Sequence, residues 1–370
     1  MNTAFPTFVL QPIPLEMWPD RLRDLLNSSP IVSDIQIQQG KQNTNGDIDG
    51  SAIFRVGDEL HYLLVECKPS GQPRHMRLAA LHLDQNINRS SSAMRGIVVA
   101  PFISSTSRAI LAENGMGWLD FAGNTRIIFP RFHLEIDKTD HDPFSRKREQ
   151  RSLFFPKSAW LLKFLLHSPR SVWKVTDLVL QTGVSAGQVS KIRRALIDRE
   201  WAVPEVGGGF RLTNPEALLD AWHYEGQRPT ELLMLGHTLK HGAALEEAIV
   251  SAFSDAANSG ARLLLAGHSV ARRVAPFARV AGEFFYADAA GLELLEHHLQ
   301  ITPTMRGENV SIYGASNDTF WLENMDLGFN LKATGVIQTY LDLLGSGERG
   351  AEAAEHWRAE QITPLLTIEP

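Results

Sequence analysis

The sequence predicts a multidomain α/β protein, and two observations support this prediction. The chain has 370 residues, which is more than a single hydrophobic core usually organises, so two or three domains are expected. Short apolar runs typical of strands alternate with amphipathic segments on both sides of a helix-rich middle stretch. We therefore expect an α/β domain at 1–137, a basic linker at 138–152, a smaller domain at 153–214 and a second α/β domain at 215–370.

The composition is that of a folded protein, and we expect it to be cytoplasmic, without a membrane partner. Hydrophobic residues make up 44% and charged residues 21% of the chain, which argues against extended disorder. The sequence contains no apolar run long enough to cross a bilayer, and its first residues lack the pattern of a secretion signal. Cys67 is the only cysteine, so no internal disulfide or paired-cysteine zinc site is expected.

The first domain begins with an amphipathic helix at 15–27, where Leu15, Trp18 and Leu22 lie at helical spacing. Alternating or apolar runs bounded by turn residues predict the strands that follow. Those strands are expected at 31–38, 50–56, 61–67 and 96–102, with two more inside 116–129. Helices are expected at 74–90 and 104–114. This order predicts one α/β domain of ordinary size.

The middle segment has the element order of a winged helix-turn-helix. A helix that begins near Phe155 and ends at Ser168 is expected before a short strand at 171–175. Two helices and a hairpin follow: 177–181 with Thr176 as its cap, 186–199 with Ser185 as its cap, and strands at 201–206 and 209–213. In such folds the second helix of the turn enters the major groove of DNA.

The helix at 186–199 has one apolar face, where Val189, Ile192 and Leu196 are expected to pack in the core, and one polar face. Arg and Gln side chains suit contacts with guanine and adenine, whereas Ser and Lys more often hold phosphates. A basic run before the domain could lie along phosphates, or it could be a solvated linker. The predicted residues for binding double-stranded DNA are Ser185, Gln188, Ser190, Lys191, Arg193, Arg194, Arg211, Arg146, Lys147 and Arg148. The alternative is a winged helix used only for protein contacts.

Two acids and a lysine lie at the ends of predicted strands in the first domain. Asp49 precedes one strand, and Glu66 and Lys68, two positions apart on the same side, end the next. This arrangement resembles the PD-(D/E)xK nuclease pattern, which implies a restriction-endonuclease-like fold. The resemblance implies that Asp49 and Glu66 bind Mg²⁺ or Mn²⁺ while Lys68 activates the attacking water. The usual proline before the first acid is absent, and an exposed ion pair without catalysis is the alternative.

The third segment is expected to be a second α/β unit. Predicted strands lie at 262–266, 283–287 and 310–314, and predicted helices at 244–258, 292–299, 333–344 and 349–360. Its Gly267-His268-Ser269 turn imitates the nucleophile elbow of serine hydrolases, although Ala271 replaces the last glycine. The turn also resembles the first motif of nucleotidyltransferase-like folds. Because the stretch FFYAD at 284–288 supplies only Asp288 in place of a pair of acids, a degenerate, non-catalytic version is expected.

Nearly the whole chain resembles the transcriptional regulators related to AbiEi antitoxins of type IV toxin–antitoxin systems. The stretch GMGWLDFAGNTRI at 115–127, the run from Gln338 to Leu343 and the helix from Gly350 to His356 carry the resemblance. It implies repression of the protein's own or a neighbouring operon, with a toxin as a partner. The winged helix is central here, whereas it is N-terminal in the better-known antitoxins, which weakens the antitoxin assignment.

Three functions are therefore to be compared. The first is a sequence-specific DNA-binding transcriptional regulator whose flanking domains position the winged helix or form a homodimer. The second is a metal-dependent DNA endonuclease directed by the winged helix. The third is an antitoxin that acts by binding a toxin protein, and DNA binding itself requires no cofactor.

Overall fold

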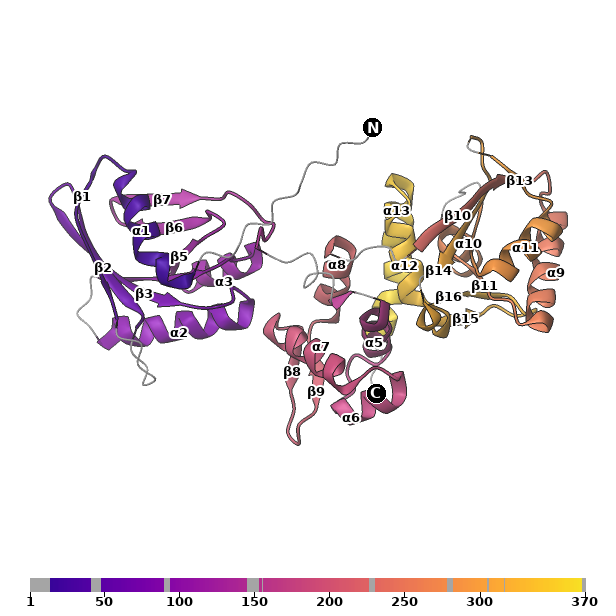
Figure 1. Ribbon diagram of the computed structural model, residues 1–370, viewed down its shortest axis with the longest axis horizontal. Helices are drawn as coiled ribbons and strands as arrows, with labels where there is room; N and C mark the ends of the chain where they lie inside the picture. Colours follow the sequence, from indigo (N-terminus) through magenta and orange to yellow (C-terminus); the bar gives the residue numbers. More distant parts are fainter. Residues whose placement is uncertain are drawn as a thin grey trace. The chain divides into compact units, whose positions relative to one another are not determined.

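The computed structural model is an α/β protein whose described residues form three β-sheets, which confirms the α/β class predicted from the sequence (Figure 1). It describes residues 14–40, 48–89, 94–144, 153–154, 156–225, 230–277, 282–304, 306–315 and 317–367. Contacts divide the chain into a first unit, Met1–Glu149 with Ala195–Glu200, and a second unit, Gln150–Arg194 with Trp201–Pro370. Within the described ranges no helix combines the length and apolar character that a membrane crossing requires.

The first unit is built on a seven-stranded mixed sheet whose strands follow one another in sequence order. Its strands are β1 Val32–Gln39, β2 Gly50–Val56, β3 Glu59–Cys67, β4 Met94–Ala100, β5 Gly117–Asp120, β6 Thr125–Phe129 and β7 Phe132–Ile136. Strands β3, β4 and β5 run parallel, and the other neighbours are antiparallel. The carboxyl ends of β3, β4 and β5 therefore meet at one edge of the sheet.

Helices cover both faces of this sheet (Figure 1). They are the 3-10 helix η1 Leu15–Met17, α1 Trp18–Asn27, α2 Pro73–Arg89 and α3 Ser105–Glu113. Helix α1 packs Trp18 and Leu22 against Phe54 and Val65 on one face. Helices α2 and α3 supply the other core, which includes Met76, Leu83 and Leu111. Successive residues of a strand thus contribute their side chains to opposite cores, because the side chains of a strand alternate between the two faces of the sheet.

A helix–hairpin segment, residues 156–212, follows and belongs to the second unit except for Ala195–Glu200. It consists of α5 Pro156–His167, α6 Val175–Thr182, α7 Ala186–Asp198, β8 Ala202–Pro204 and β9 Phe210–Leu212. Gly183 ends α6 in the left-handed conformation, which glycine adopts at little cost. The expected strand at 171–175 is reduced to one bridge between Trp173 and Phe210. The expected cap role of Thr176 is wrong, because α6 begins at Val175 and its cap residue is Lys174.

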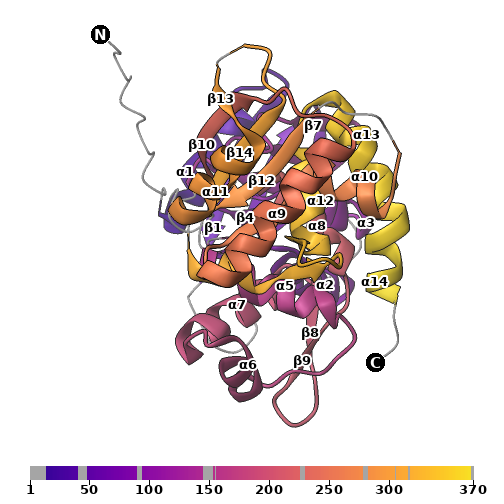
Figure 2. The ribbon, with the colours of Figure 1, turned by 90° about the vertical axis from the view of Figure 1, so that its right-hand side faces the viewer.

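The second unit continues with a seven-stranded sheet in the order β13-β10-β14-β12-β11-β16-β15. Its strands are β10 Thr230–His237, β11 Leu263–Leu265, β12 Glu283–Ala287, β13 Thr302–Pro303, β14 Val310–Ala315, β15 Asn324–Asp326 and β16 Lys332–Thr334. Its helices are α8 Pro215–Glu225, α9 Ala243–Ser259, α10 Gly267–Val274, α11 Ala289–Leu299, η2 Asp318–Leu322, α12 Val336–Leu344, α13 Glu348–Trp357, η3 Arg358–Ile362 and α14 Thr363–Thr367. Helices α9 and α11 pack against each other (Figure 2), and α5 packs on η2 and α14.

Candidate functional site

Helix α7 has one buried face and one exposed polar face. Three apolar side chains form the buried face and are at most 2% exposed: Val189, Ile192 and Leu196. Predicted DNA contacts lie exposed on the helix or directly before it, and we call these the α7 polar face: Ser185, Ser190, Lys191 and Arg194. Residues 190 and 191 lie near residue 194 on the helix surface because they precede it by four and three positions. The helix can thus pack into the fold and still present polar groups outward.

The two cations of the α7 polar face have no counter-charge within hydrogen-bond or ion-pair distance in the part of the chain that the structure describes. In the described part of the chain, neither Lys191 nor Arg194 makes a hydrogen bond or an ion pair. A positive charge that is not neutralised within the protein is available to an external anion such as a phosphate. These two side chains are therefore the strongest candidates for contacts with a nucleic acid.

Two other predicted contacts of α7, Gln188 and Arg193, connect the helix to its neighbours. The Nε2 of Gln188 donates to the Oγ of Ser158 on α5 at 2.8 Å, and Ser158 is 1% exposed. The guanidinium carbon of Arg193 lies 6.0 Å from the ring centre of Phe210 on β9. Both side chains are only partly exposed. In this arrangement they hold α7 in place rather than extending from its polar face.

The hairpin that follows α7 carries the predicted contact Arg211. Its Nε lies 3.0 Å from the Oε1 of Glu205 on the other side of the hairpin. Gly207 and Gly208 form the tip with φ of 87° each, a conformation that favours glycine. Arg211 is thus paired, in contrast to Lys191 on α7. The remaining predicted contacts, Arg146, Lys147 and Arg148, lie outside the described residues.

The structure brings the acids and the lysine of the first unit to one edge of its sheet. Because β2 and β3 are antiparallel, Asp49 lies beside the end of β3. The Oδ2 of Asp49 accepts a hydrogen bond from the backbone N–H of Cys67 at 2.7 Å. The Nζ of Lys68 lies 2.6 Å from the Oε1 of Glu66. The spacing of the three residues in the sequence therefore corresponds to proximity in the fold.

Glu66 has a second partner, His82 on α2, which the sequence analysis did not identify. The Nδ1 of His82 lies 3.0 Å from the Oε2 of Glu66, and Glu66 is 4% exposed. The Oε1 of Glu66 thus accepts a hydrogen bond from Lys68, whereas its buried Oε2 has His82 close by but no hydrogen bond from the described residues. The helical period gives the signal for this contact, since His82 follows the buried Ala79 by three positions and so lies near the sheet-facing side of α2.

The Asp49 and Glu66 carboxylates, as arranged, do not fit a divalent metal. A cation would have to displace Lys68 and His82 from Glu66, and Asp49 already accepts a backbone hydrogen bond. Burial, together with the nearby Asp49 and Glu66 charges, raises the pKa of the Cys67 thiol, which makes it a poor ligand. Across the described residues, no three His, Cys, Asp or Glu side chains converge on one point. We therefore derive no metal-dependent step from this edge.

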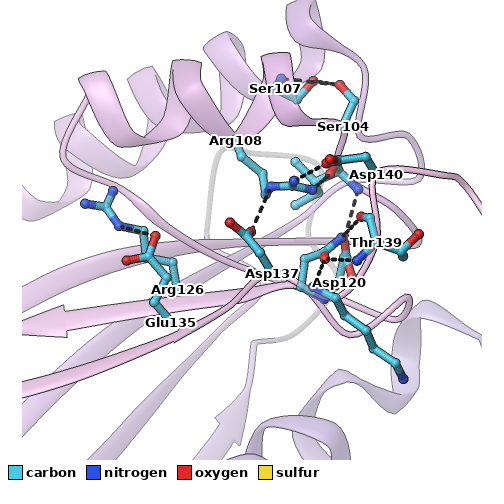
Figure 3. Close-up of polar contacts among 12 residues, drawn as sticks. Ser104, Ser107, Arg108, Asp120, Arg126, Glu135, Asp137, Thr139 and Asp140 are labelled. Atoms are coloured by element: carbon cyan, nitrogen blue, oxygen red, sulfur yellow. Dashed lines mark hydrogen bonds and ion pairs between the residues drawn. The ribbon is translucent and has the colours of Figure 1, made fainter. Parts of the chain in front are cut away.

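The GWLDFAGN stretch forms a closed hairpin between β5 and β6 (Figure 3). Asp120 is fully buried and accepts hydrogen bonds from the backbone N–H groups of Gly123 and Asn124 at 2.8 Å and of Ile103 at 3.1 Å. The Nδ2 of Asn124 also donates to Asp120 at 2.8 Å. Burial raises the pKa of the Asp120 carboxyl, although the bonds from Asn124, Ile103 and Gly123 oppose this. This stretch therefore stabilises the hairpin and the loop after β4.

The same hairpin holds the first residues of the predicted linker. The Oδ1 of Asn124 accepts hydrogen bonds from the backbone N–H groups of Lys138 at 2.8 Å and Thr139 at 3.0 Å. Arg108, which is 7% exposed, pairs with Asp140 at 2.5 Å and donates to the carbonyl of Ile103 at 2.8 Å (Figure 3). The chain just after β7 is thus part of the packed structure of the first unit.

In the second unit, the residues that imitate catalytic motifs have structural partners. Ser269 is fully buried; its Oγ donates to Glu283 at 2.5 Å and accepts from the backbone N–H of Phe284 at 2.8 Å. Asp288 caps α11 by accepting from the backbone N–H of Gly291 at 2.8 Å. A serine nucleophile must be accessible to its substrate, so the geometry of Ser269 does not suit a hydrolase.

Comparisons with known proteins leave the function to be argued from this geometry. No protein-family model, no curated protein and no solved structure matches the chain. The α7 polar face and the acidic edge near Glu66 are consequently the two features on which a functional assignment depends.

Proposed function

We propose that this protein binds double-stranded DNA through a winged helix and regulates transcription. The winged helix comprises α5, α6, α7 and the β8–β9 hairpin. One observation carries the proposal: Lys191 and Arg194 are exposed on α7 and have no ion-pair partner among the described residues. A helix of this kind fits the major groove, where Arg suits guanine and where Lys and Ser suit the flanking phosphates.

The two α/β regions then act as supports of the DNA-binding helix. The order of the first unit, a helix, three antiparallel strands, a helix and a parallel strand, supports a restriction-endonuclease-like fold. The strand–turn–helix at β11 and α10 supports a degenerate nucleotidyltransferase-like fold for the second. Because Glu66 and Ser269 are buried and bonded within the protein, both folds are proposed to serve without catalysis.

A metal-dependent endonuclease is the second candidate function. The proximity of Asp49, Glu66 and Lys68 at one sheet edge is the observation in its favour. The pairing of Glu66 with both Lys68 and His82 favours the non-cleaving regulator, since a metal ion would compete with two neighbouring groups for this carboxylate.

The resemblance to AbiEi-related regulators adds a toxin protein as a proposed partner. Co-purification of the chain with the product of an adjacent reading frame tests whether such a partner exists.

The test of the proposal is DNA binding by the full chain and by a Lys191→Ala, Arg194→Ala double variant. Duplexes that cover the region upstream of the protein's own operon are titrated at low salt, and binding is followed by fluorescence anisotropy. Because one good base contact is worth about 1–3 kcal/mol, the double variant is expected to bind at least about tenfold more weakly. Lys332→Ala removes an exposed cation from β16 and should leave the affinity unchanged.

The same duplexes, incubated with Mg²⁺ or Mn²⁺, separate the two candidate functions. The regulator leaves the DNA intact at concentrations where it is fully bound. Cutting that is abolished by Lys68→Ala would establish the endonuclease instead. If the wild-type chain binds no upstream duplex and the double variant behaves identically, the DNA-binding proposal is contradicted.

A further inference from the structure

Helix α5 contacts α7 at one end and the interior of the second unit further along. Ser158, near its start, accepts the hydrogen bond from Gln188 of α7. Lys163, five positions later, is 4% exposed although it carries a charged ammonium group. A buried ammonium is costly unless it is paired and hydrogen-bonded, so the partners of Lys163 restrict where α5 can lie.

The partners of Lys163 come from the C-terminal part of the chain. Its Nζ lies 2.8 Å from the Oε2 of Glu323, which follows η2, and donates to the Oε1 of Gln338 on α12 at 2.8 Å. The same ammonium lies 5.3 Å from the centre of the Phe320 ring. Lys163 and Gln338 are 175 positions apart in the sequence, so these contacts fix α5 against distant parts of the fold.

Glu323 is itself held from several directions. The Nε2 of His167 on α5 lies 3.0 Å from its Oε1, and the backbone N–H of Ile337 donates to the same oxygen at 3.3 Å. Burial raises the pKa of Glu323, but Lys163 and His167 outweigh it and hold the pKa below its ordinary value. A Cβ on Gly335 would come within 2.4 Å of the Glu323 carboxyl, so a glycine there makes room for it.

The polar contacts continue from Gln338 into the sheet. The Nε2 of Gln338 donates to the Oδ1 of Asp342 at 2.7 Å, and the hydroxyl of Tyr286 on β12 donates to the same oxygen at 2.8 Å. A series of contacts thus runs from the sheet through α12 to Lys163, and helix α5 itself connects Lys163 to Ser158, which accepts from Gln188 of α7. Buried polar networks of this kind select one arrangement among several that apolar packing alone would allow.

We infer that Glu323 and Gln338 are positioning residues for DNA binding: by fixing Lys163 they fix α5, which through Ser158 sets the orientation of α7. This inference rests on the proposed function. DNA binding then requires the second α/β region, although none of the residues of this region touches the nucleic acid. The region acts by holding α5 and thereby α7 in position. Gln188 is then the last link of the series rather than a base contact.

Two end variants interrupt the series: Glu323→Gln removes the charge that holds Lys163, and Gln188→Ala removes the contact between α7 and α5. The control is Glu352→Gln, which makes the same change of charge at an exposed acid on α13. Hydrogen exchange of the α7 amides is measured in the free full-length chain, at a temperature where circular dichroism shows the variants to be folded. DNA affinity is measured in parallel. Both end variants are expected to exchange faster in α7 and to bind DNA about tenfold more weakly, whereas the control changes neither quantity.

A folded Glu323→Gln protein with unaltered exchange in α7 would overturn the inference, whatever its DNA affinity. If Glu323→Gln does not fold, Gln338→Ala replaces it, because this variant leaves the Lys163–Glu323 ion pair in place and removes a neutral partner. Faster exchange in α7 of a protein that binds no DNA even as wild type would support the positioning role and contradict the proposed function.

Discussion

The α7 polar face and the acidic edge of the first unit both concentrate charged residues, but their charges are used in opposite ways. On α7, Lys191 and Arg194 are exposed and, within the described chain, make no ion pair. At the edge, Glu66 is 4% exposed and faces both Lys68 and His82. A charge with an internal partner contributes to the fold, and a charge without one is available for a ligand. The residue types alone do not distinguish these cases.

Lys68→Met gives the largest expected effect on stability. The substitution removes one partner of the buried Glu66 carboxylate, which should lower the free energy of unfolding by about 2 kcal/mol because Lys68 is itself partly exposed. DNA affinity should not change. Urea denaturation measures the first quantity and anisotropy the second. Lys191→Met is the matched variant and should show the reverse, with weaker DNA binding and a stability change within about 0.5 kcal/mol.

Glu323 extends the comparison to a buried acid with a lowered pKa. Its ionised form stabilises the fold at pH values above its ordinary pKa of 4.5, and this contribution is lost as the pH falls through its lower folded-state pKa. The stability difference between the wild-type protein and Glu323→Gln should therefore shrink below pH 4.5, by about 1.4 kcal/mol for each unit of pKa shift. Unfolding free energies measured at a series of acidic pH values check this. A difference that stays constant with pH would show that Glu323 is not held ionised.

Substitutions in the ion pair between Arg211 and Glu205 have the smallest expected effects on DNA affinity. Replacing the arginine should lower the affinity, and replacing the glutamate should raise it. Arg211 is already paired at 3.0 Å, so Arg211→Ala should weaken DNA binding by less than about threefold. Glu205→Ala releases the arginine and should strengthen DNA binding by a similar factor. Anisotropy titrations of both variants at one salt concentration measure this. Equal losses of affinity in the two variants would instead indicate that the hairpin conformation depends on the pair.

The sequence predicts many of the regular elements because their periodicity is local, but it misses α8 and the eight-residue strand β10. Strands β2 and β12 begin and end at the predicted residues. Strand β7 was missed although its residues, FHLEI, alternate between apolar and polar side chains as a half-buried strand does. Strands β15 and β16 have three residues each, and they exist only through pairing that local propensity does not encode. Short strands of this kind follow from the tertiary fold.

The candidate site shows the same division between local and distant information. The sequence places Lys191 and Arg194 on the outer side of a helix, and the structure exposes them. It also suggests that Gln188 faces outward, but α5 reaches this residue with Ser158. The contact between His82 and Glu66 likewise depends on how α2 is rotated over the sheet. Side chains at the border of a helical face thus depend on which neighbour packs there.

The salt dependence of DNA binding tests the central claim most directly. Each phosphate contact contributes about 0.9 to the slope of the logarithm of the binding constant against the logarithm of salt concentration. If Lys191 and Arg194 face the DNA, the double alanine variant should bind more weakly and show a slope smaller by about one to two, while Lys332→Ala keeps the wild-type slope. An unchanged slope and affinity in the double variant would contradict the assignment of α7 as the DNA-binding helix.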